Sequence, residues 1–434
     1  MRLLLKGGRV IDPSQNIDTV TDILIEDGKI SRIEKGISLP EADSGGDLKI
    51  FDLKDKIVTP GLIDMHTHLR EPGFEYKETV RTGSEAAVAG GFTSIACMAN
   101  TDPVNDNRSV TEFIHKQARL AAMANVYPIA AISKGQDGKV LTEFGDLKNA
   151  GAVAFSDDGN PVTDSGLMRH ALEYAYSFNM PVISHCEDTG LSSGGLMHEG
   201  FVSTQLGLPG IPGISEDIMV IRDIRLAGFT KTRVHIAHVS TAGSVQAVRE
   251  AKSAGINVTA ETAPHYFTLT DEALRGFSTN FKMYPPLRGA DDVEAIKEGL
   301  RDGTIDAIAS DHAPHSSVEK DVEFEYAANG ITGLETSLPL CLKLVDDGIL
   351  TINQLVEKMS VNPADILKIP KGSLKTGSDA DITVVDMNKI WTVDTDTFRS
   401  KGRNCPFNGW KLKGKAVMTI VGGDVKYADS GFQI

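Results

Sequence analysis

The middle of the chain alternates short apolar runs with longer segments whose apolar residues recur at helical spacing. This pattern extends from about residue 57 to residue 370 and is typical of repeated βα units, so it predicts a parallel sheet. Since eight parallel strands close a barrel, we expect a (β/α)8 barrel. The strand candidates end at or near His68, Asn100, Ile132, Asp158, His185, His238, Glu261 and Asp311.

The two ends of the chain have a different pattern, of β-like runs separated by turn residues. An Asp27-Gly28 step between two apolar runs favours a hairpin. Each end alone is too small to bury a core. We therefore expect residues 1–56 and 371–434 to form one small composite β-sandwich domain, and residues 57–370 to form the barrel. The β-like runs are residues 3–10, 23–25, 30–33, 382–385 and 418–421.

Composition and charge narrow the class of protein. With 434 residues, of which 41% are hydrophobic and 24% charged, the chain resembles an ordinary globular enzyme and not a disordered or fibrous protein. Its formal net charge of −15 disfavours nucleic acid and anionic membrane surfaces as partners. No apolar segment approaches the length of a membrane span. The cysteines form no CxxC pair, which favours reduced thiols and a cytoplasmic location.

A pair of histidines closes the first strand candidate. His66 and His68 are two residues apart, so on a strand their side chains share one face and can hold one metal ion together. A single histidine at such a place is more often a packing or surface residue. A pair at the end of an apolar run favours metal ligation instead.

Later strand candidates end in residues of the same kinds. His185, His238 and Asp311 each follow an apolar run, and the carboxyl ends of barrel strands meet at one face of the barrel. We expect these side chains to converge with the first pair. Four histidines and carboxylates suit zinc or a similar divalent metal. His235, three residues before His238, is interpreted as structural because it falls on the opposite face of its strand.

Two longer stretches carry a family resemblance. They are residues 64–73 (DMHTHLREPG) and residues 309–315 (ASDHAPH), and they resemble the two signature regions of dihydroorotases, members of the amidohydrolase superfamily. The similarity runs along almost the whole chain, including residues 377–381. It implies a zinc-dependent hydrolase with one or two Zn²⁺ ions and a small-molecule substrate. This enzyme would interconvert dihydroorotate and N-carbamoyl-L-aspartate in pyrimidine biosynthesis.

The resemblance is to the bacterial long-chain class, in which an aspartate replaces the carboxylated lysine that bridges two metals in many relatives. Asp158 matches that aspartate. Lys148, the nearest upstream lysine, would lie toward the opposite end of the barrel if the intervening residues are extended. The implied ligands are His66, His68 and Asp311 for one ion and His185 and His238 for the other, with Asp158 between the two.

The resemblance also implies catalytic and substrate-binding residues. Asp311 is the candidate general acid and base, acting with water activated by the metals. Arg70 offers a planar fork for the substrate carboxylate. The family normally has asparagine in place of Tyr284 and Pro-Phe-Gly where this chain has residues 328–330. The remaining candidate substrate contacts are His68, Asn100, Tyr284, His315, Asn329 and Gly330.

Two alternatives remain open at this point. One is another cyclic amide hydrolase, such as an allantoinase or hydantoinase, which Tyr284 and Asn329 favour and which Arg70, His315 and the absence of a bridging lysine disfavour. The other is a non-catalytic partner of aspartate transcarbamoylase, which is disfavoured because all six candidate metal ligands are present. The resemblance suggests a homodimer or an assembly with aspartate transcarbamoylase.

Overall fold

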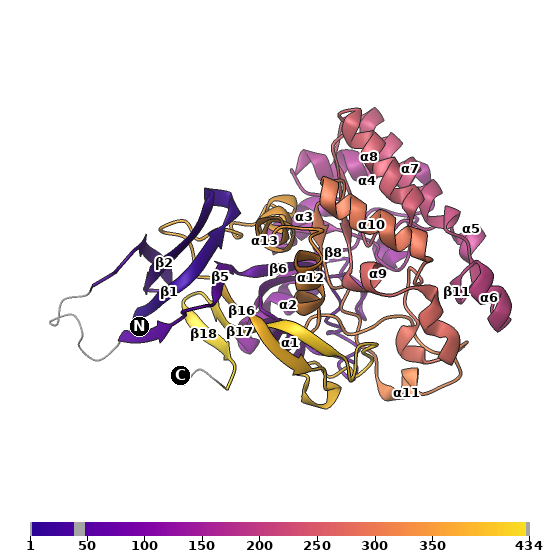
Figure 1. The fold of residues 1–434 in the computed structure, drawn as a ribbon. Helices are drawn as coiled ribbons and strands as arrows, with labels where there is room; N and C mark the ends of the chain where they lie inside the picture. The colour runs from indigo at the N-terminus through magenta and orange to yellow at the C-terminus, as the bar shows by residue number, and fades with distance from the viewer. Residues whose placement is uncertain (1, 39–47, 431–434) are drawn as a thin grey trace.

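The computed structural model describes residues 2–38 and 48–430. Strands from both ends of the chain lie side by side, in indigo and yellow on the left of Figure 1, and the helices of the middle of the chain gather on the right. The chain thus combines a barrel with a β-sheet built from its two ends.

The barrel consists of two parallel sheets of four strands, with the orders β6-β7-β8-β9 and β10-β13-β14-β15. Single bridges join the two sheets into a ring, because Phe155 pairs with Val182 and Thr67 pairs with His312. The predicted (β/α)8 barrel is confirmed. Its strands are β6 (Leu62–Thr67), β7 (Phe92–Cys97), β8 (Asn125–Ala130), β9 (Ala154–Phe155), β10 (Ile183–Ser184), β13 (Val234–Ile236), β14 (Val258–Thr262) and β15 (Ala307–Ile308).

Helices alternate with the barrel strands, and their ends follow from local sequence. The first begins at a capping box between Thr79 and Thr82 and ends at Gly91, whose φ is 95°, a conformation that glycine adopts without strain. The apolar faces of helices and strands share one buried cluster. The helices are α1 (Val80–Gly90), α2 (Arg108–Ala121), α3 (Phe144–Ala150), α4 (Ser165–Ser177), α7 (Ile214–Thr230), α8 (Ala242–Ser253), α10 (Ala290–Asp302) and α12 (Ser337–Asp346).

Shorter helices and strands lie in the connections between the barrel strands and the longer helices. Two of them, β11 and β12, pair with each other in parallel. They lie in the long connection between β10 and α7, next to the mouth of the barrel. The short elements are α5 (Thr189–Ser192), β11 (Met197–His198), α6 (Phe201–Leu206), β12 (Gly210–Ile211), α9 (Pro264–Thr268), α11 (Ser317–Lys320), α13 (Ile352–Val356) and α14 (Asn362–Leu367).

The strands of the two chain ends form one 8-stranded sheet, in which the path β18-β17-β16-β5-β1-β2-β3 is joined by β4 pairing with β1. The predicted hairpin is present: Asp27 and Gly28, with φ of 49° and 76°, join β2 to β3, as a two-residue hairpin turn requires. The strands are β1 (Arg2–Asp12), β2 (Ile17–Glu26), β3 (Lys29–Glu34), β4 (Leu48–Asp52), β5 (Ile57–Pro60), β16 (Ile382–Thr392), β17 (Lys411–Val421) and β18 (Asp424–Ala428).

Strand β5 connects the sheet of the chain ends to the barrel. We expected residue 57 to open the barrel, but β5 pairs in parallel with β1 and antiparallel with β16. Both edges of β5 are therefore hydrogen-bonded within the sheet of the chain ends, and the barrel begins with β6. The division of the chain into two domains stays a prediction.

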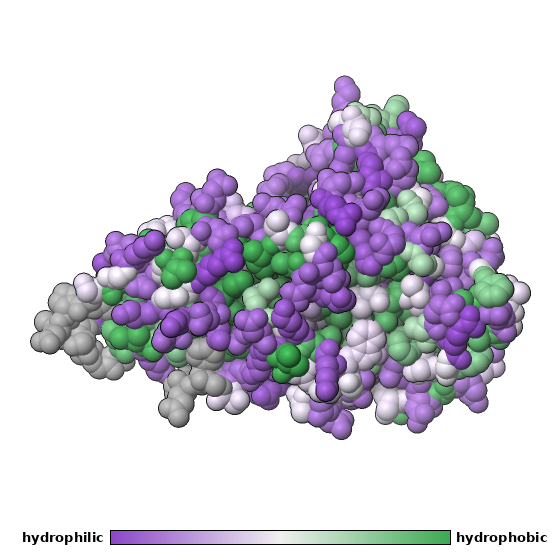
Figure 2. Space-filling view, viewed as in Figure 1, coloured by the Kyte–Doolittle hydropathy of each residue, from purple (hydrophilic) through white to green (hydrophobic). Residues whose placement is uncertain are grey.

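Polar residues cover most of the face seen in Figure 2, with apolar residues between them. Among residues 2–38 and 48–430, no helix has both the length and the apolar character needed to cross a membrane.

Candidate metal centre

Six residues converge where the barrel strands end, and none of these residues is more than 8% exposed. Five of them fall into two groups that share Asp158, and Asp311 lies beside the first group. The ligand atoms of His66, His68 and Asp158 lie within 4.8 Å of one another, and so do those of Asp158, His185 and His238. The structure thus brings together the candidate ligands His66, His68, Asp158, His185, His238 and Asp311.

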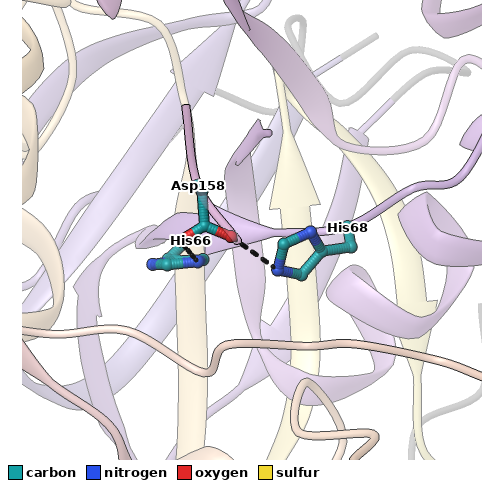
Figure 3. Close-up of side chains that lie close together, drawn as sticks. All are labelled: His66, His68 and Asp158. Carbon is teal, nitrogen blue, oxygen red and sulfur yellow. Dashed lines mark ion pairs between the residues drawn. The ribbon is translucent and has the colours of Figure 1, made fainter. Parts of the chain in front are cut away.

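Asp158 contacts the histidines of both groups, and Figure 3 shows it with His66 and His68. Its Oδ1 is 3.4 Å from Nε2 of His66, and its Oδ2 is 3.5 Å from Nε2 of His68. On the other side, Oδ1 is 3.3 Å from Nε2 of His238 and 3.5 Å from Nδ1 of His185. One carboxylate therefore faces four imidazole rings, which is the arrangement that a bridging ligand requires.

Asp311 follows β15 and faces the first histidine pair. Its Oδ1 lies 3.2 Å from Nε2 of His68 and 3.6 Å from Nε2 of His66. Burial alone would raise the pKa of Asp311, but the charges of His66 and His68 and the hydrogen bond from His68 outweigh burial and lower the pKa to about 2. The carboxyl group is therefore ionised at neutral pH and can accept a proton.

A buried carboxylate fixes the orientation of the His66 ring. Nδ1 of His66 lies 2.7 Å from Oε1 of Glu261. Burial alone would raise the pKa of Glu261, but hydrogen bonds from His235 and His66 lower it to about 2, so this oxygen accepts and Nδ1 carries the proton. Nε2 of His66 then points to the centre, where it is buried and has no hydrogen-bond partner among the described residues.

A second carboxylate holds His185. Oε2 of Glu187 lies 3.3 Å from Nε2 of His185, and Oε1 accepts hydrogen bonds from the hydroxyl groups of Tyr284 and Ser192. The rings of Tyr284 and His185 are nearly parallel, with centroids 6.2 Å apart. Nδ1 of His185 consequently faces the centre, 2.8 Å from Nε2 of His238.

This set of donors fits a divalent metal ion. Nε2 of His66 is a buried polar atom without a partner, which native proteins rarely leave unsatisfied. Nδ1 of His185 and Nε2 of His238 also meet at the centre, 2.8 Å apart. A cation between these ring nitrogens and the carboxylates would satisfy them all, and imidazole and carboxylate are ligands of zinc-like metals.

The candidate substrate residues surround this centre. Nδ1 of His68 lies 2.9 Å from the amide oxygen of Asn100, so Asn100 also orients a candidate ligand. Nε2 of His315 donates to the carbonyl oxygen of Asn329 at 2.7 Å, and the Arg70 guanidinium lies 3.4 Å from the same ring nitrogen. The residue after Asn329 is Gly330, with φ of 129°, where a Cβ would lie 2.6 Å from the Cβ of Ala313. Only glycine fits there.

Sequence reasoning named Glu261 only as the end of a strand and did not single out Glu187. A signal existed for both. Glu261 is a charged residue at the end of an otherwise apolar strand, where a carboxylate is rarely buried without a partner. Glu187 lies two residues after His185 and therefore continues the same strand face. The neighbouring Asp157 has a structural role, since its carboxylate accepts from the backbone N–H groups of Ile132 and Ser133.

Comparisons with known proteins agree with this geometry. Residues 55–244 match the family described as Dihydro-orotase-like, and residues 215–427 match the Amidohydrolase family. The dihydroorotase of Syntrophus aciditrophicus is 62% identical over 99% of this chain and 100% of that protein. The dihydroorotase of Geobacter metallireducens is 58% identical over 98% of this chain and 100% of that protein.

Solved structures show the same fold at lower identity. An L-hydantoinase from Arthrobacter aurescens superimposes with a TM-score of 0.85 at 25% identity, covering 100% of this chain and 97% of that chain. A D-hydantoinase superimposes with a TM-score of 0.87 at 24% identity, covering 100% of this chain and 96% of that chain. Given its identity to the curated relatives over almost its full length, the chain belongs to the dihydroorotase family of the amidohydrolase superfamily.

Proposed function

We propose that the chain catalyses the reversible hydrolysis of dihydroorotate to N-carbamoyl-L-aspartate, a step of pyrimidine biosynthesis. The observation that carries the proposal is the pair of ligand groups that share Asp158 in a chain 62% identical to a dihydroorotase. A cyclic amide is a stable substrate, so its hydrolysis needs both an activated water and a stabilised carbonyl oxygen. A site with two groups of metal ligands can supply both.

For the metal we propose Zn²⁺, one or two ions per chain, because imidazole and carboxylate donors suit it. His66, His68 and Asp311 would hold one ion, His185 and His238 the other, and Asp158 would contact both. When bound, such ions lower the pKa of water and polarise a carbonyl group. Glu261 and Glu187 would hold the other ring nitrogens of His66 and His185, and so direct Nε2 of His66 and Nδ1 of His185 to the metal.

Asp311 is the proposed general acid and base. Its carboxylate lies at the centre, 3.2 Å from Nε2 of His68, and is ionised at neutral pH because its pKa is lowered to about 2. It would take the proton of the attacking water and deliver it to the ring nitrogen that leaves. In the reverse direction the same carboxylate would take a proton from the carbamoyl nitrogen before the ring closes.

The substrate carboxylate calls for cationic and amide donors close to the centre. Arg70 is buried, and burial lowers its pKa to about 10, so it stays charged at neutral pH. Its Nε donates to the carbonyl oxygen of Pro314 at 3.2 Å, which fixes the plane of the guanidinium. We propose Arg70 as the carboxylate contact. The other proposed substrate contacts are His68, Asn100, Tyr284, His315, Asn329 and Gly330.

Hydrolysis of another cyclic amide, such as allantoin or a hydantoin, is the second candidate. Tyr284 and Asn329 favour it, because both replace residues usual in dihydroorotases at the pocket for the substrate ring. The hydroxyl group of Tyr284 is engaged with Glu187, beside a metal ligand. The hydroxyl group can thus support the metal ligand His185 through Glu187 while the aromatic ring lines the pocket. The replacement of asparagine by Tyr284 is therefore compatible with dihydroorotate as substrate.

The proposal also covers the cellular location and the oligomeric form of the enzyme. We place it in the cytoplasm, where thiols stay reduced, because Cys97, Cys186, Cys341 and Cys405 are all free and buried. We keep a homodimer or an assembly with aspartate transcarbamoylase as the expected forms in solution. Size-exclusion chromatography with light scattering, alone and with that partner, tests them.

The experiment that tests the function is turnover of dihydroorotate and carbamoyl aspartate by the purified, zinc-loaded chain, with allantoin and hydantoin alongside. Preference for dihydroorotate, lost on chelation and restored by zinc, is the expected result. Turnover of the other rings alone would show that Tyr284 and Asn329 redirect the site. If nothing reacts while metal is bound, even after addition of aspartate transcarbamoylase, the chain is not a catalyst.

A further inference from the structure

The connection between β16 and β17, in the sheet of the chain ends, places a buried asparagine at the candidate substrate pocket. Asn404 lies in the connection between β16 and β17, outside the barrel, yet it is only 3% exposed. It lines a pocket of about 260 Å³ together with His315 and Lys320. A buried side-chain amide needs partners for its oxygen and for both of its N–H groups.

Every polar group of the Asn404 side chain is used, and all its partners belong to two loops at the barrel mouth. Its Oδ1 accepts from the backbone N–H of His315 at 3.0 Å. Its Nδ2 donates to the carbonyl oxygens of Ala313 at 3.1 Å and of Gly330 at 3.0 Å. The backbone of Asn404 adds a fourth contact, because its carbonyl oxygen accepts from the N–H of Thr332 at 3.0 Å.

The two loops that Asn404 joins carry proposed substrate contacts. Residues 313–315 end in His315, and residues 329–332 begin with Asn329 and Gly330. The loops also meet directly, since the His315 ring donates to the carbonyl oxygen of Asn329 at 2.7 Å. Asn404 holds the backbone on either side of this contact, so it fixes where the imidazole and the Gly330 backbone lie relative to each other.

The segment around Asn404 is itself anchored to the barrel. Glu78 accepts from the hydroxyl group of Ser400 and from the N–H of Lys401. A Cβ added at Gly402 would lie 2.7 Å from the Cβ of Pro314 and 2.8 Å from Cγ2 of Thr332. The backbone thus approaches both loops as closely as glycine allows, and this close packing makes Asn404 a rigid support.

We propose that Asn404 is a positioning residue for substrate binding: it joins the two loops that carry His315, Asn329 and Gly330, and it does so from the sheet of the chain ends. This inference rests on the proposed function. It gives that sheet a role in substrate affinity in addition to its role in folding. Asn404 touches none of the metal ligands, so its effect falls on substrate binding and not on metal content.

The test is steady-state kinetics of the zinc-loaded Asn404→Asp variant, which keeps the shape of the side chain. A carboxylate still accepts from the His315 N–H but cannot donate to the carbonyl oxygens of Ala313 and Gly330, and it repels them. We expect KM for dihydroorotate to rise about tenfold, while kcat changes less than about threefold and the metal content stays that of the parent. Gly402→Ala, which pushes the same contacts apart, should raise KM in the same way.

Asn408→Asp is the matched control, because Asn408 is exposed in the same connection and its side-chain oxygen accepts from the N–H of Thr395, which also lies between β16 and β17. It should leave KM unchanged. An unchanged KM in folded Asn404→Asp and Gly402→Ala overturns the inference, and so does a fall in kcat that merely follows metal loss. A parent that does not turn over dihydroorotate would instead refute the proposed function, so the two failures are distinguishable.

Discussion

The hydroxyl group of Tyr284 donates a hydrogen bond to Glu187, and the other carboxylate oxygen of Glu187 lies 3.3 Å from Nε2 of His185. A residue that departs from the family pattern thus supports a candidate metal ligand through one carboxylate. Partners of this kind orient a ligating imidazole and raise its basicity, and their loss typically weakens metal binding. Tyr284 therefore has two proposed roles, support of His185 through Glu187 and contact with the substrate, and experiment can separate them.

Tyr284→Phe removes the hydroxyl group and keeps the ring. If the hydroxyl group supports His185, the variant should lose metal to a competing chelator at about tenfold lower chelator concentration than the parent, with KM for dihydroorotate unchanged when zinc is in excess. Tyr76→Phe, at a tyrosine that is 59% exposed, is the control. A raised KM with parental resistance to the chelator would show instead that the phenol contacts the substrate.

Asp158→Ala should lower the metal content, because Asp158 is the one side chain shared by both ligand groups. Plasma mass spectrometry of the purified variant measures the metal bound per chain. Asp157→Asn is the matched control at the neighbouring aspartate, whose carboxylate accepts from the N–H of Ser133. That change should lower the unfolding temperature and keep the metal. Parental stoichiometry in Asp158→Ala would contradict the bridging role.

Asp311→Asn should keep much of the metal and lose turnover. An amide can still contact a metal through its oxygen, but it cannot take up the proton of the attacking water, so kcat should fall by a factor of about 10² to 10⁴. Metal analysis and kinetics on the same preparation distinguish the two effects. Near-normal turnover in the metal-loaded variant would rule out Asp311 as the general base.

The pH dependence of stability should reveal a half-buried carboxyl group, that of Glu335, beside the Asn404 segment. Burial raises the pKa of Glu335 to about 7, although the N–H groups of Ser400 and Arg399 oppose this shift. Because the folded pKa lies above the ordinary value of 4.5, the folded state binds more protons between pH 4.5 and pH 7. The stabilisation is complete below pH 4.5 and is lost as the pH rises through 7.

The parent should therefore lose more unfolding free energy between pH 5 and pH 8 than Glu335→Gln does, by about 1 to 3 kcal/mol. Chemical denaturation of both proteins at the two pH values measures this difference, and effects of the metal centre cancel in the comparison. Glu323→Gln, at an exposed position, should match the parent. Parallel pH profiles for the parent and Glu335→Gln would contradict the assignment.

The sequence predicted the barrel well because its strands are short apolar runs that end in polar residues. His66, His185 and Asp311 each stand at such an end, and closure of the barrel brings these ends together. Pattern and topology therefore sufficed to gather the candidate ligands. The hairpin at Asp27-Gly28 followed from local turn chemistry in the same way.

Contacts between distant parts of the chain could not be predicted in this way. Nothing in the sequence around Asn404 indicates that its amide meets Ala313, His315 and Gly330, because the pairing depends on how the C-terminal sheet packs on the barrel mouth. Strand β5 was assigned to the barrel for a related reason. Its apolar residues suit either sheet, and only its partners β1 and β16 decide the matter.

The place of β5 between β1 and β16 has a consequence for synthesis on the ribosome. Pro60 pairs with Ile382, so this edge of β5 has no partner until β16 has been translated. At about 5 to 20 residues per second, that interval lasts on the order of half a minute. Throughout this time the nascent chain carries an open strand edge of the kind that promotes aggregation. Completion of the sheet around β5 is thus a late event in the biogenesis of the protein.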